Sequence, residues 1–251
     1  MTGSETVARR VALVTGASRG IGAETAKGLA ATGMHVVVNY REKARRAQAV
    51  ADDIVAAGGS ASTIGADLSD RAAVTGMLGE LERDYGRLDA LVLNASGGLE
   101  RDADPGYALR LNRDAQVHLA TAALPLLAPG GRIVFITSHQ AHFHGTGRPL
   151  PDGYEPIAAS KRAGEDALRA LIPEFARHAV GFTVVSGDMI DGTIIIRLLE
   201  RRDPDAVAAR RTAGPLPTVE DFAATVVRAV DAEVPEGHTY YVGGEDYVGA
   251  R

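Results

Sequence analysis

The sequence predicts an α/β fold, a doubly wound parallel sheet of about seven strands in a three-layer α/β/α arrangement. Short apolar runs rich in β-branched residues alternate with longer segments of helical period along the chain. A glycine-rich turn also follows the first apolar run directly and opens the first helical segment. Because 251 residues can bury one substantial core, we expect a single domain, 1–251.

The expected elements follow from this alternation. The strands are expected at Val11–Val14, Met34–Val38, Ser62–Gly65, Ala90–Leu93, Gly131–Ile136, Phe182–Val185 and Thr239–Val242. The helices are expected at Ile21–Ala31, Lys43–Ala57, Arg71–Tyr85, Tyr107–Leu127, Ile157–Ala179 and Val219–Ala232. Ser69 or Asp70 and Thr218 are expected N-caps.

Two irregular stretches follow the ends of expected strands, at 139–155 and at 188–217. In a doubly wound sheet, ligands bind at the carboxyl ends of the strands. We therefore expect residues 139–155 to form a substrate loop and residues 188–217 to form a lid.

Composition excludes several classes of function. The net charge is -5 and the basic residues are dispersed, which predicts no nucleic-acid partner. The absence of cysteine excludes disulfides and thiolate chemistry. No apolar run approaches the ~20 residues of a membrane span, and the polar segment Met1–Arg10 has no signal-peptide core. We expect a cytoplasmic protein that does not bind membranes.

The glycine-rich turn runs from Thr15 to Gly22, with glycines at 16, 20 and 22. Glycines allow a tight turn and close approach of the backbone to a pyrophosphate, while the helix N-terminus offers free N–H groups to the anion. The spacing TGxxxGxG resembles that of the short-chain dehydrogenase/reductase family. The resemblance implies a Rossmann-type sheet, a nicotinamide cofactor and oxidoreduction between CH–OH and C=O.

Three further segments are similar to that family. They are Asp67-Leu68 after the third strand, Asn94-Ala95-Ser96-Gly97 after the fourth, and Ser186-Gly187-Asp188-Met189 after the sixth. The chain departs from the family pattern at Leu93, Ser96 and Ser186, and Thr193 is displaced. The cofactor contacts that the resemblance implies are Gly16, Ser18, Arg19, Gly20, Ile21, Gly22, Asn39, Tyr40, Arg41, Asp67, Leu68, Asn94, Ala95, Ser96, Lys161, Gly187, Met189 and Thr193.

The end of the second strand indicates which cofactor binds. An acidic residue there would accept a hydrogen bond from the ribose 2′-OH of NAD, whereas a cation accommodates a 2′-phosphate. This chain has Asn39-Tyr40-Arg41, and Arg19 lies in the glycine loop. Because two guanidinium groups suit a phosphate, the sequence favours NADP(H) over NAD.

The resemblance also implies catalytic residues. Asn112, Ser138 and Lys161 match the family's Asn, Ser and Lys, with roles in holding a relay water, polarising the carbonyl and binding ribose. The family tyrosine should stand four residues before the lysine, and that position is Ile157. Isoleucine cannot donate a proton, so the usual acid is absent from its usual place.

Tyr154 is the candidate substitute for this tyrosine. We expect Pro156 to push Glu155 towards an extended conformation, which would leave Tyr154 on the loop that enters the helix. If Tyr154 is the acid, the nearby ammonium of Lys161 should lower its pKa from ~10 towards neutrality.

Other readings stay open. The proton could come from His139, His142 or His144, since imidazole has a pKa of ~6.5, or from the substrate itself. A metal site is not expected because no carboxylate lies among these histidines. The fold could instead serve a dehydratase, isomerase or cyclase, or a non-catalytic nucleotide-binding subunit. The family resemblance further implies a homo-oligomer, a dimer or a tetramer, acting on a small carbonyl or alcohol.

Overall fold

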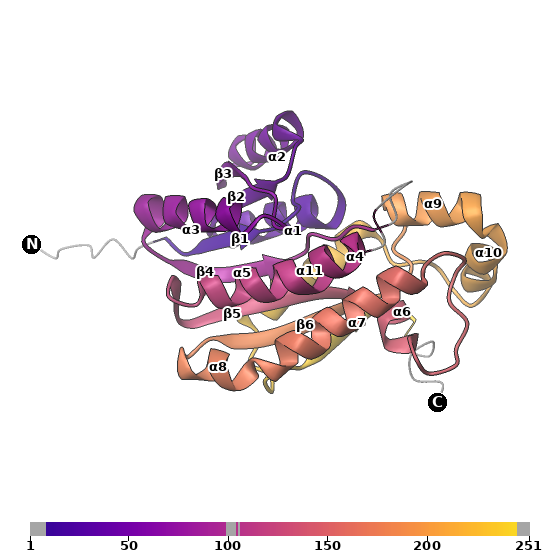
Figure 1. The fold of residues 1–251 in the computed structure, drawn as a ribbon. Helices are drawn as coiled ribbons and strands as arrows, with labels where there is room; N and C mark the ends of the chain where they lie inside the picture. The colour runs from indigo at the N-terminus through magenta and orange to yellow at the C-terminus, as the bar shows by residue number, and fades with distance from the viewer. Residues whose placement is uncertain (1–8, 99–103, 105, 245–251) are drawn as a thin grey trace, which may run out of the picture.

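The computed structural model describes residues 9–98, 104 and 106–244, and its seven described strands form one parallel sheet in the order β3-β2-β1-β4-β5-β6-β7 (Figure 1). The strands are β1 (Val11–Val14), β2 (His35–Tyr40), β3 (Ser60–Gly65), β4 (Leu88–Leu93), β5 (Leu127–Ser138), β6 (Gly181–Gly187) and β7 (Thr239–Val242). The strand order reverses between β1 and β4, so the predicted doubly wound fold is confirmed.

Helices of several lengths connect the strands. They are α1 (Gly20–Ala31), α2 (Ala44–Ala56), α3 (Arg71–Tyr85), α4 (Tyr107–Leu109), the π-helix η1 (Arg110–Ala115), α5 (Gln116–Ala123), α6 (His139–Phe143), α7 (Glu155–Ala170), α8 (Ile172–Arg177), α9 (Ile194–Arg202), α10 (Pro204–Thr212) and α11 (Val219–Asp231). Figure 1 shows α4, α6, α9 and α10 gathered at one end of the sheet and α8 at the other.

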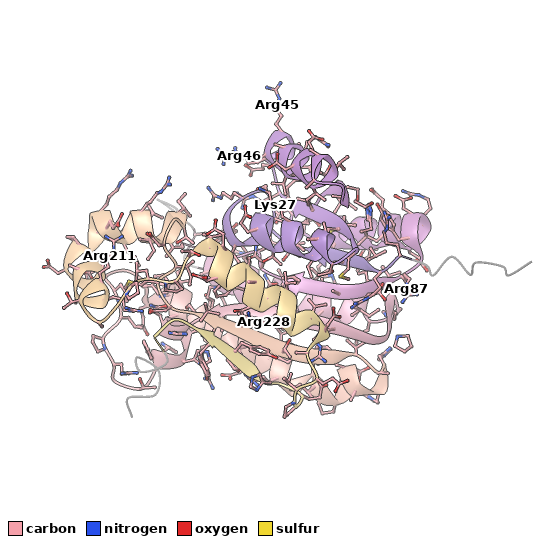
Figure 2. The ribbon with its side chains drawn as sticks, turned by 180° about the vertical axis from the view of Figure 1, so that it is seen from behind. Lys27, Arg45, Arg46, Arg87, Arg211 and Arg228 are labelled. Carbon is pink, nitrogen blue, oxygen red and sulfur yellow. The ribbon has the colours of Figure 1, made fainter. Side chains whose placement is uncertain are left out.

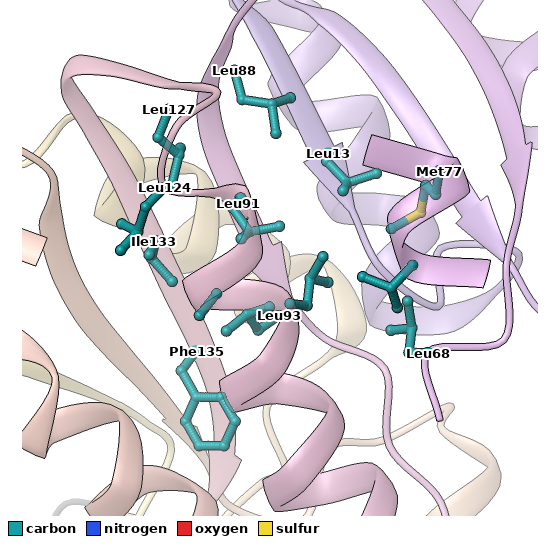
Figure 3. Packing of buried hydrophobic residues seen from close by; sticks show 14 of the residues in the cluster. Leu13, Leu68, Met77, Leu88, Leu91, Leu93, Leu124, Leu127, Ile133 and Phe135 are labelled. Atoms are coloured by element: carbon teal, nitrogen blue, oxygen red, sulfur yellow. The ribbon is translucent and has the colours of Figure 1, made fainter. Parts of the chain in front are cut away.

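Each face of the sheet carries its own core. Val11 and Leu13 of β1 point to the face covered by α3, α5 and α7, where Figure 3 shows Leu13 and Met77 among the packed leucines. Ala12 and Val14 point to the opposite face, covered by α1, α2 and α11, the side seen in Figure 2. This alternation follows from the two-residue period of a strand, and burying both faces explains the continuous apolar runs.

A third, smaller cluster joins the lid region to the rest of the molecule. Ile196 and Leu199 of α9 and Val207 of α10 pack with Tyr154 and Ile157 at the start of α7. The lid helices therefore rest on the segment where the sequence places the candidate catalytic residues.

Several predicted boundaries were wrong. The helix expected at 107–127 ends at Ala123 and is interrupted by η1, and β5 begins at Leu127. The helix expected at 157–179 starts at Glu155 and is divided between α7 and α8, because Pro173 starts a new helix in the first turn of α8. The stretch 188–217 is not irregular, since it contains α9 and α10. Asp203 caps α10 and Pro204 opens it, a helix-start signal that the sequence carries.

Other predictions were confirmed. Asp70 caps α3 by accepting from the N–H groups of Ala72 and Ala73, and Thr218 forms a capping box with Asp221 at α11. Within the described ranges, no helix combines the length and the apolar character that crossing a membrane requires. The segment 1–8, most of the predicted polar N-terminus, lies outside the described residues.

Candidate active site

The glycine turn lies at the head of α1, with Arg19 as an extended N-cap whose side chain makes no capping hydrogen bond. Gly16 and Gly20 have φ of +61° and +55°, a left-handed region that favours glycine. A Cβ at Gly20 would meet no atom within 4 Å. Gly20, Ile21 and Gly22 at the uncapped start of α1 line open space, and the first N–H groups of a helix have no partner within it, which is the arrangement that binds an anion.

A buried hydrogen-bond network holds this turn in place. The Asn94 amide donates to the carbonyl of Thr15 at 2.8 Å, and the Thr15 hydroxyl accepts from the N–H groups of Asn94 and Ala95 at 2.9 and 3.0 Å. The Asn39 side-chain oxygen accepts from the N–H of Gly16 at 3.2 Å. Asn39 and Asn94 were predicted as cofactor contacts, and the structure shows that both also shape the turn.

Gly22 is the most confined glycine of the turn. A Cβ there would lie 2.6 Å from Nδ2 of Asn94 and 2.8 Å from the carbonyl oxygen of Gly16. Gln116, which sequence reasoning missed, supports the same region by donating to the carbonyl of Ala95 at 2.9 Å. The sequence around Gln116 does not indicate this role, because the residues that it contacts belong to a segment that is distant in the chain.

One cavity of about 990 Å³ runs along the carboxyl ends of the strands and contains almost all the predicted site residues. It is lined by the complete predicted cofactor set, Gly16, Ser18, Arg19, Gly20, Ile21, Gly22, Asn39, Tyr40, Arg41, Asp67, Leu68, Asn94, Ala95, Ser96, Lys161, Gly187, Met189 and Thr193. Ser138 and Tyr154 line it as well, whereas Asn112 does not. Folding thus brings together segments that the sequence spreads over nearly 180 positions.

Cations dominate the end of the cavity beside β2. Arg19, Arg41, Lys43 and Arg46 line it there. Arg41 donates to the Tyr107 hydroxyl of α4 and lies 3.2 Å from Glu42. The resulting positive field suits a phosphate group.

Asp67, an acidic group on the same cavity wall, is already engaged. Its Oδ1 accepts from the N–H and the hydroxyl of Ser69 at 2.9 and 2.6 Å. With Glu42 it offsets part of the positive charge, and the four cations leave this end of the cavity with an excess of positive charge.

Tyr154 lies at the other end of the cavity as the N-cap of α7. Its carbonyl accepts from the N–H groups of Ile157 and Ala158 at 3.0 Å each, and its side chain is 5% exposed. Burial raises the pKa of Tyr154, and the Ser138 hydroxyl opposes this rise. The expected lowering of this pKa by Lys161 is therefore not found.

The start of α7 differs from expectation. Glu155 is the first helical residue and not an extended one. Pro156 occupies the first turn, where a missing N–H costs nothing, and Oε1 of Glu155 lies 2.8 Å from Nδ1 of His144. A negative charge at a helix N-terminus is also favourable, which outweighs the pre-proline preference. Tyr154 is thus held by the helix rather than by a loose loop.

Lys161 lies on α7 one turn after Ile157 and is 9% exposed. Its Nζ donates to the carbonyl of Ile136 at 3.4 Å, and no carboxylate of the described residues lies within 4 Å of it. Burial lowers the pKa of Lys161 to about 8. An ammonium in this position changes charge close to neutral pH.

Asn112 belongs to the π-helix and is 1% exposed. Its amide donates to the carbonyl of Gly97 at 3.0 Å and to the Ser160 hydroxyl at 2.9 Å, while its oxygen accepts from the N–H of Gly97 at 3.3 Å. This side chain holds the segment after β4 against α7, and its predicted role in holding a relay water stays a prediction.

The three histidines of the predicted substrate loop 139–155 do not reach the cavity, and two of them, His139 and His142, lie on the helix α6 rather than on a loop. None of His139, His142 and His144 lines the cavity. Burial lowers the pKa of His139 to about 4 and also lowers that of His142, whose Nε2 lies 3.5 Å from Glu165. The alternative in which one of them protonates substrate is therefore not supported by their placement. Among the described residues, no group of three or more His, Asp or Glu side chains is arranged to hold a metal ion.

A buried ion pair holds the lid near the catalytic end. Arg210 of α10 donates to Oδ2 of Asp188, which follows β6, and the two side chains are 5% and 0% exposed. Arg210 also donates to the carbonyl of Gly214 at 3.0 Å. The lid is thus fixed to the end of the strand beside β5.

A glycine turn at the head of α1, facing a cavity at the strand-order reversal, defines a dinucleotide-binding α/β fold of Rossmann type. Residues 10–202 match the short chain dehydrogenase family, and the chain belongs to that family.

Relatives with known names support this assignment. The chain is 35% identical to 1-cyclohexenylcarbonyl-CoA reductase of Streptomyces collinus over 73% of its length, and spans 65% of that relative. A short chain dehydrogenase from Burkholderia cenocepacia, solved in complex with NADP, is 32% identical with a TM-score of 0.80, covering 94% of this chain and 97% of that one. The angucycline C-6 ketoreductase LanV, solved with bound NADP, is 27% identical with a TM-score of 0.78, covering 92% and 93%.

Proposed function

We propose that the protein is an NADP(H)-dependent carbonyl reductase or alcohol dehydrogenase in which Tyr154 replaces the family tyrosine at the substrate oxygen. One observation carries the proposal. A single cavity is lined by the anion-binding turn at one end and by Ser138, Tyr154 and Lys161 at the other. A dinucleotide bound along it would extend from the turn towards these three side chains.

The residues present fit such a cofactor. The uncapped start of α1 and the open space over Gly20 would receive the pyrophosphate, and Gly187 and Met189 would lie along the nicotinamide. When bound, the cofactor would supply a hydride to a carbonyl carbon or accept one from an alcohol. Lys161 would donate a hydrogen bond to a ribose hydroxyl, since two of its three N–H groups have no partner among the described residues.

The phosphorylated form of the cofactor is the better match. Four cations surround the end of the cavity where the 2′-phosphate would lie, and Arg41 offers the planar donor pattern that matches phosphate oxygens. Two solved relatives of the chain contain NADP.

At the catalytic end, two hydroxyls would hold the substrate oxygen. The Ser138 hydroxyl is buried and interacts with the Tyr154 phenol, whose pKa it lowers, and both side chains line the same cavity. Donors aimed at an oxygen that becomes negative stabilise the transition state. Apolar walls formed by Leu111, Ile157 and Leu198 suit a small, largely apolar carbonyl compound. We extend the proposal to a homo-oligomer, as the family resemblance implies.

The proposal is tested with purified protein in two steps. Calorimetry should detect NADPH binding, and a panel of ketones should then accelerate the loss of NADPH absorbance. Absence of heat with both NADPH and NADH would overturn the assignment.

The cofactor preference has its own test. Arg41→Ala should weaken NADPH binding by roughly 10–100-fold and leave NADH binding nearly unchanged, because a charge-assisted hydrogen bond contributes about 1.5–3 kcal/mol. Arg45→Ala is the matched control, since Arg45 is exposed on α2 and does not line the cavity (Figure 2). Equal losses for both cofactors would argue against phosphate recognition by Arg41.

A further inference from the structure

Lys161 is an unusual group for the interior of a protein. Its side chain is 9% exposed, and a single long hydrogen bond of 3.4 Å to the Ile136 carbonyl accounts for one of its three donors. Buried ammonium groups are normally paired with a carboxylate, and none of the described residues supplies one here. An unpaired buried cation that lines a ligand cavity has its remaining donors free for the ligand.

Among the described residues, other titratable groups at this end of the sheet are paired elsewhere or buried. Asp188, which follows β6, is engaged with Arg210 of α10, and His139 of α6 is completely buried. From α4, Tyr107 accepts from Arg41. Burial is accordingly the cause that lowers the pKa of Lys161, to about 8.

At the start of α7, the N-cap residue Tyr154 is a further titratable group that lines the cavity, and it does not stand one turn before Lys161 as the family tyrosine would. The residue one turn before Lys161 is Ile157, which is 2% exposed and packs towards Gly98 and Ala108. No phenol therefore stands between Lys161 and the cavity at that place. Burial raises the pKa of the Tyr154 phenol, which makes it a weaker acid and a less effective proton donor.

We propose that the ammonium of Lys161, rather than a tyrosine phenol, delivers the proton in carbonyl reduction, with Ser138 and Tyr154 holding the oxygen by hydrogen bonds. This inference rests on the proposed function. When bound, the reduced cofactor would supply a hydride to the carbonyl carbon, and the C=O π pair would move to the oxygen. The oxygen takes a proton from Nζ and becomes the hydroxyl of the alcohol. Lys161 is left as a neutral amine, which takes a proton from water before the next turnover.

The acid strength of such a group suits the task. General acids are most effective when their pKa lies near the operating pH, and burial places Lys161 there. The active form is the protonated one. Reduction should therefore be independent of pH well below 8 and fall about tenfold per pH unit well above it, because the fraction of ammonium falls by that factor.

The first experiment needs no variant. NMR titration of the Lys161 ¹³Cε signal in the ligand-free protein should give a midpoint about 8, and kcat for ketone reduction should fall with the same midpoint. A Lys161 midpoint above about 10, the value of a free lysine, would overturn the proposal.

The second experiment distinguishes proton donation by Lys161 from the effect of its positive charge. Lys161→Arg keeps a cation that can bind ribose but cannot release a proton near neutral pH, so kcat should fall by about 10²–10⁴-fold. NADPH affinity, measured by calorimetry, should stay within about threefold. Lys161→Met is the neutral companion and should lose both kcat and affinity, with circular dichroism checking the fold of each variant.

Tyr154→Phe supplies the comparison. It should lower kcat by roughly tenfold, because one hydrogen bond to the substrate oxygen is lost. The decrease of kcat at alkaline pH should remain. A Tyr154→Phe enzyme without that fall would assign the proton to Tyr154 and overturn the proposal. Full turnover in Lys161→Arg would overturn the proton-donor role of Lys161 and would leave the proposed function standing. A wild type that binds NADPH and reduces no ketone would overturn the proposed function itself.

Discussion

Two polar clusters lie at the carboxyl edge of the same sheet, and they use their hydrogen bonds differently. Around the glycine turn, each side-chain donor of Thr15, Asn39 and Asn94 bonds to a nearby backbone carbonyl, and the Asn39 oxygen accepts from the N–H of Gly16. Around β5 and β6, the Thr137 hydroxyl and Oδ1 of Asp188 are buried and have no partner among the described residues.

This contrast has an energetic meaning. An unsatisfied buried polar group costs about 1–3 kcal/mol, so a fold tolerates several only where a ligand completes them or where function requires strain. The polar side chains around the glycine turn are thus satisfied within the chain, and we expect a ligand to complete those around β5 and β6. Substitutions around the glycine turn should affect stability and binding by changing the shape of the turn. Substitutions around β5 and β6 should affect them by changing charge and hydrogen bonding.

The largest effect is expected from the ion pair that fixes the lid. Asp188→Ala leaves the 5% exposed Arg210 as an uncompensated buried cation, which should lower the free energy of unfolding by about 3–5 kcal/mol. Urea denaturation measures this loss. Removing both charges, in Asp188→Ala with Arg210→Met, should recover most of it.

The exposed pair of Arg162 and Asp166 on α7 offers a control for this result. Asp166→Ala should cost less than about 0.5 kcal/mol, because surface pairs contribute little. Equal losses of unfolding free energy in Asp188→Ala and Asp166→Ala would show that the buried pair of Asp188 and Arg210 stabilises the fold no more than a surface pair does.

A change of shape in the glycine turn should come next. Gly22→Ala places a methyl group 2.6 Å from Nδ2 of Asn94 and 2.8 Å from the Gly16 carbonyl, so the turn must move. We expect a loss of about 1–3 kcal/mol in stability and at least tenfold weaker NADPH binding. Thermal unfolding and calorimetry measure the two effects.

Gly76→Ala on α3 is the matched control, since a Cβ there meets nothing within 4 Å. It should raise stability by about 0.5–1 kcal/mol, the difference in helix propensity, and leave NADPH binding unchanged. If the Gly22→Ala variant binds NADPH as tightly as the wild type, the turn accommodates the methyl group without loss of the cofactor site, and the prediction is wrong.

The smallest effect concerns acid stability around β5 and β6. Burial holds the pKa of His139 at about 4, below its ordinary value of 6.5. Between these values the unfolded chain binds more protons than the folded one, so stability is lost as pH falls through this window. At pH 5.5 the loss should be about 1 kcal/mol from this residue.

His139→Gln isolates this contribution from those of other groups. The difference in unfolding free energy between pH 7 and pH 5.5 should be about 1 kcal/mol smaller in the variant than in the wild type. Identical differences in the two proteins would show that His139 stays neutral for another reason or titrates normally.

Local patterns were sufficient for much of this molecule. The strands Val11–Val14 and Thr239–Val242, the helix Arg71–Tyr85 and the caps at Asp70 and Thr218 match their predicted positions because neighbouring residues determine them. Asp203 before Pro204 was an available start signal for α10 that the prediction did not use. The start of β5 was not predictable in this way, because Leu127 is a strand residue only through its pairing with Leu88.

The sequence by itself determined the doubly wound sheet, the anion-binding turn and the absence of a tyrosine at 157, since each depends on residue type and short spacing. Only the tertiary structure decided how the remaining polar groups behave. It kept His139, His142 and His144 out of the cavity, buried Tyr154 at a helix start and, among the described residues, gave Lys161 no carboxylate partner. Burial and pairing depend on segments far apart in the chain, and these two quantities set the pKa of an ionisable group.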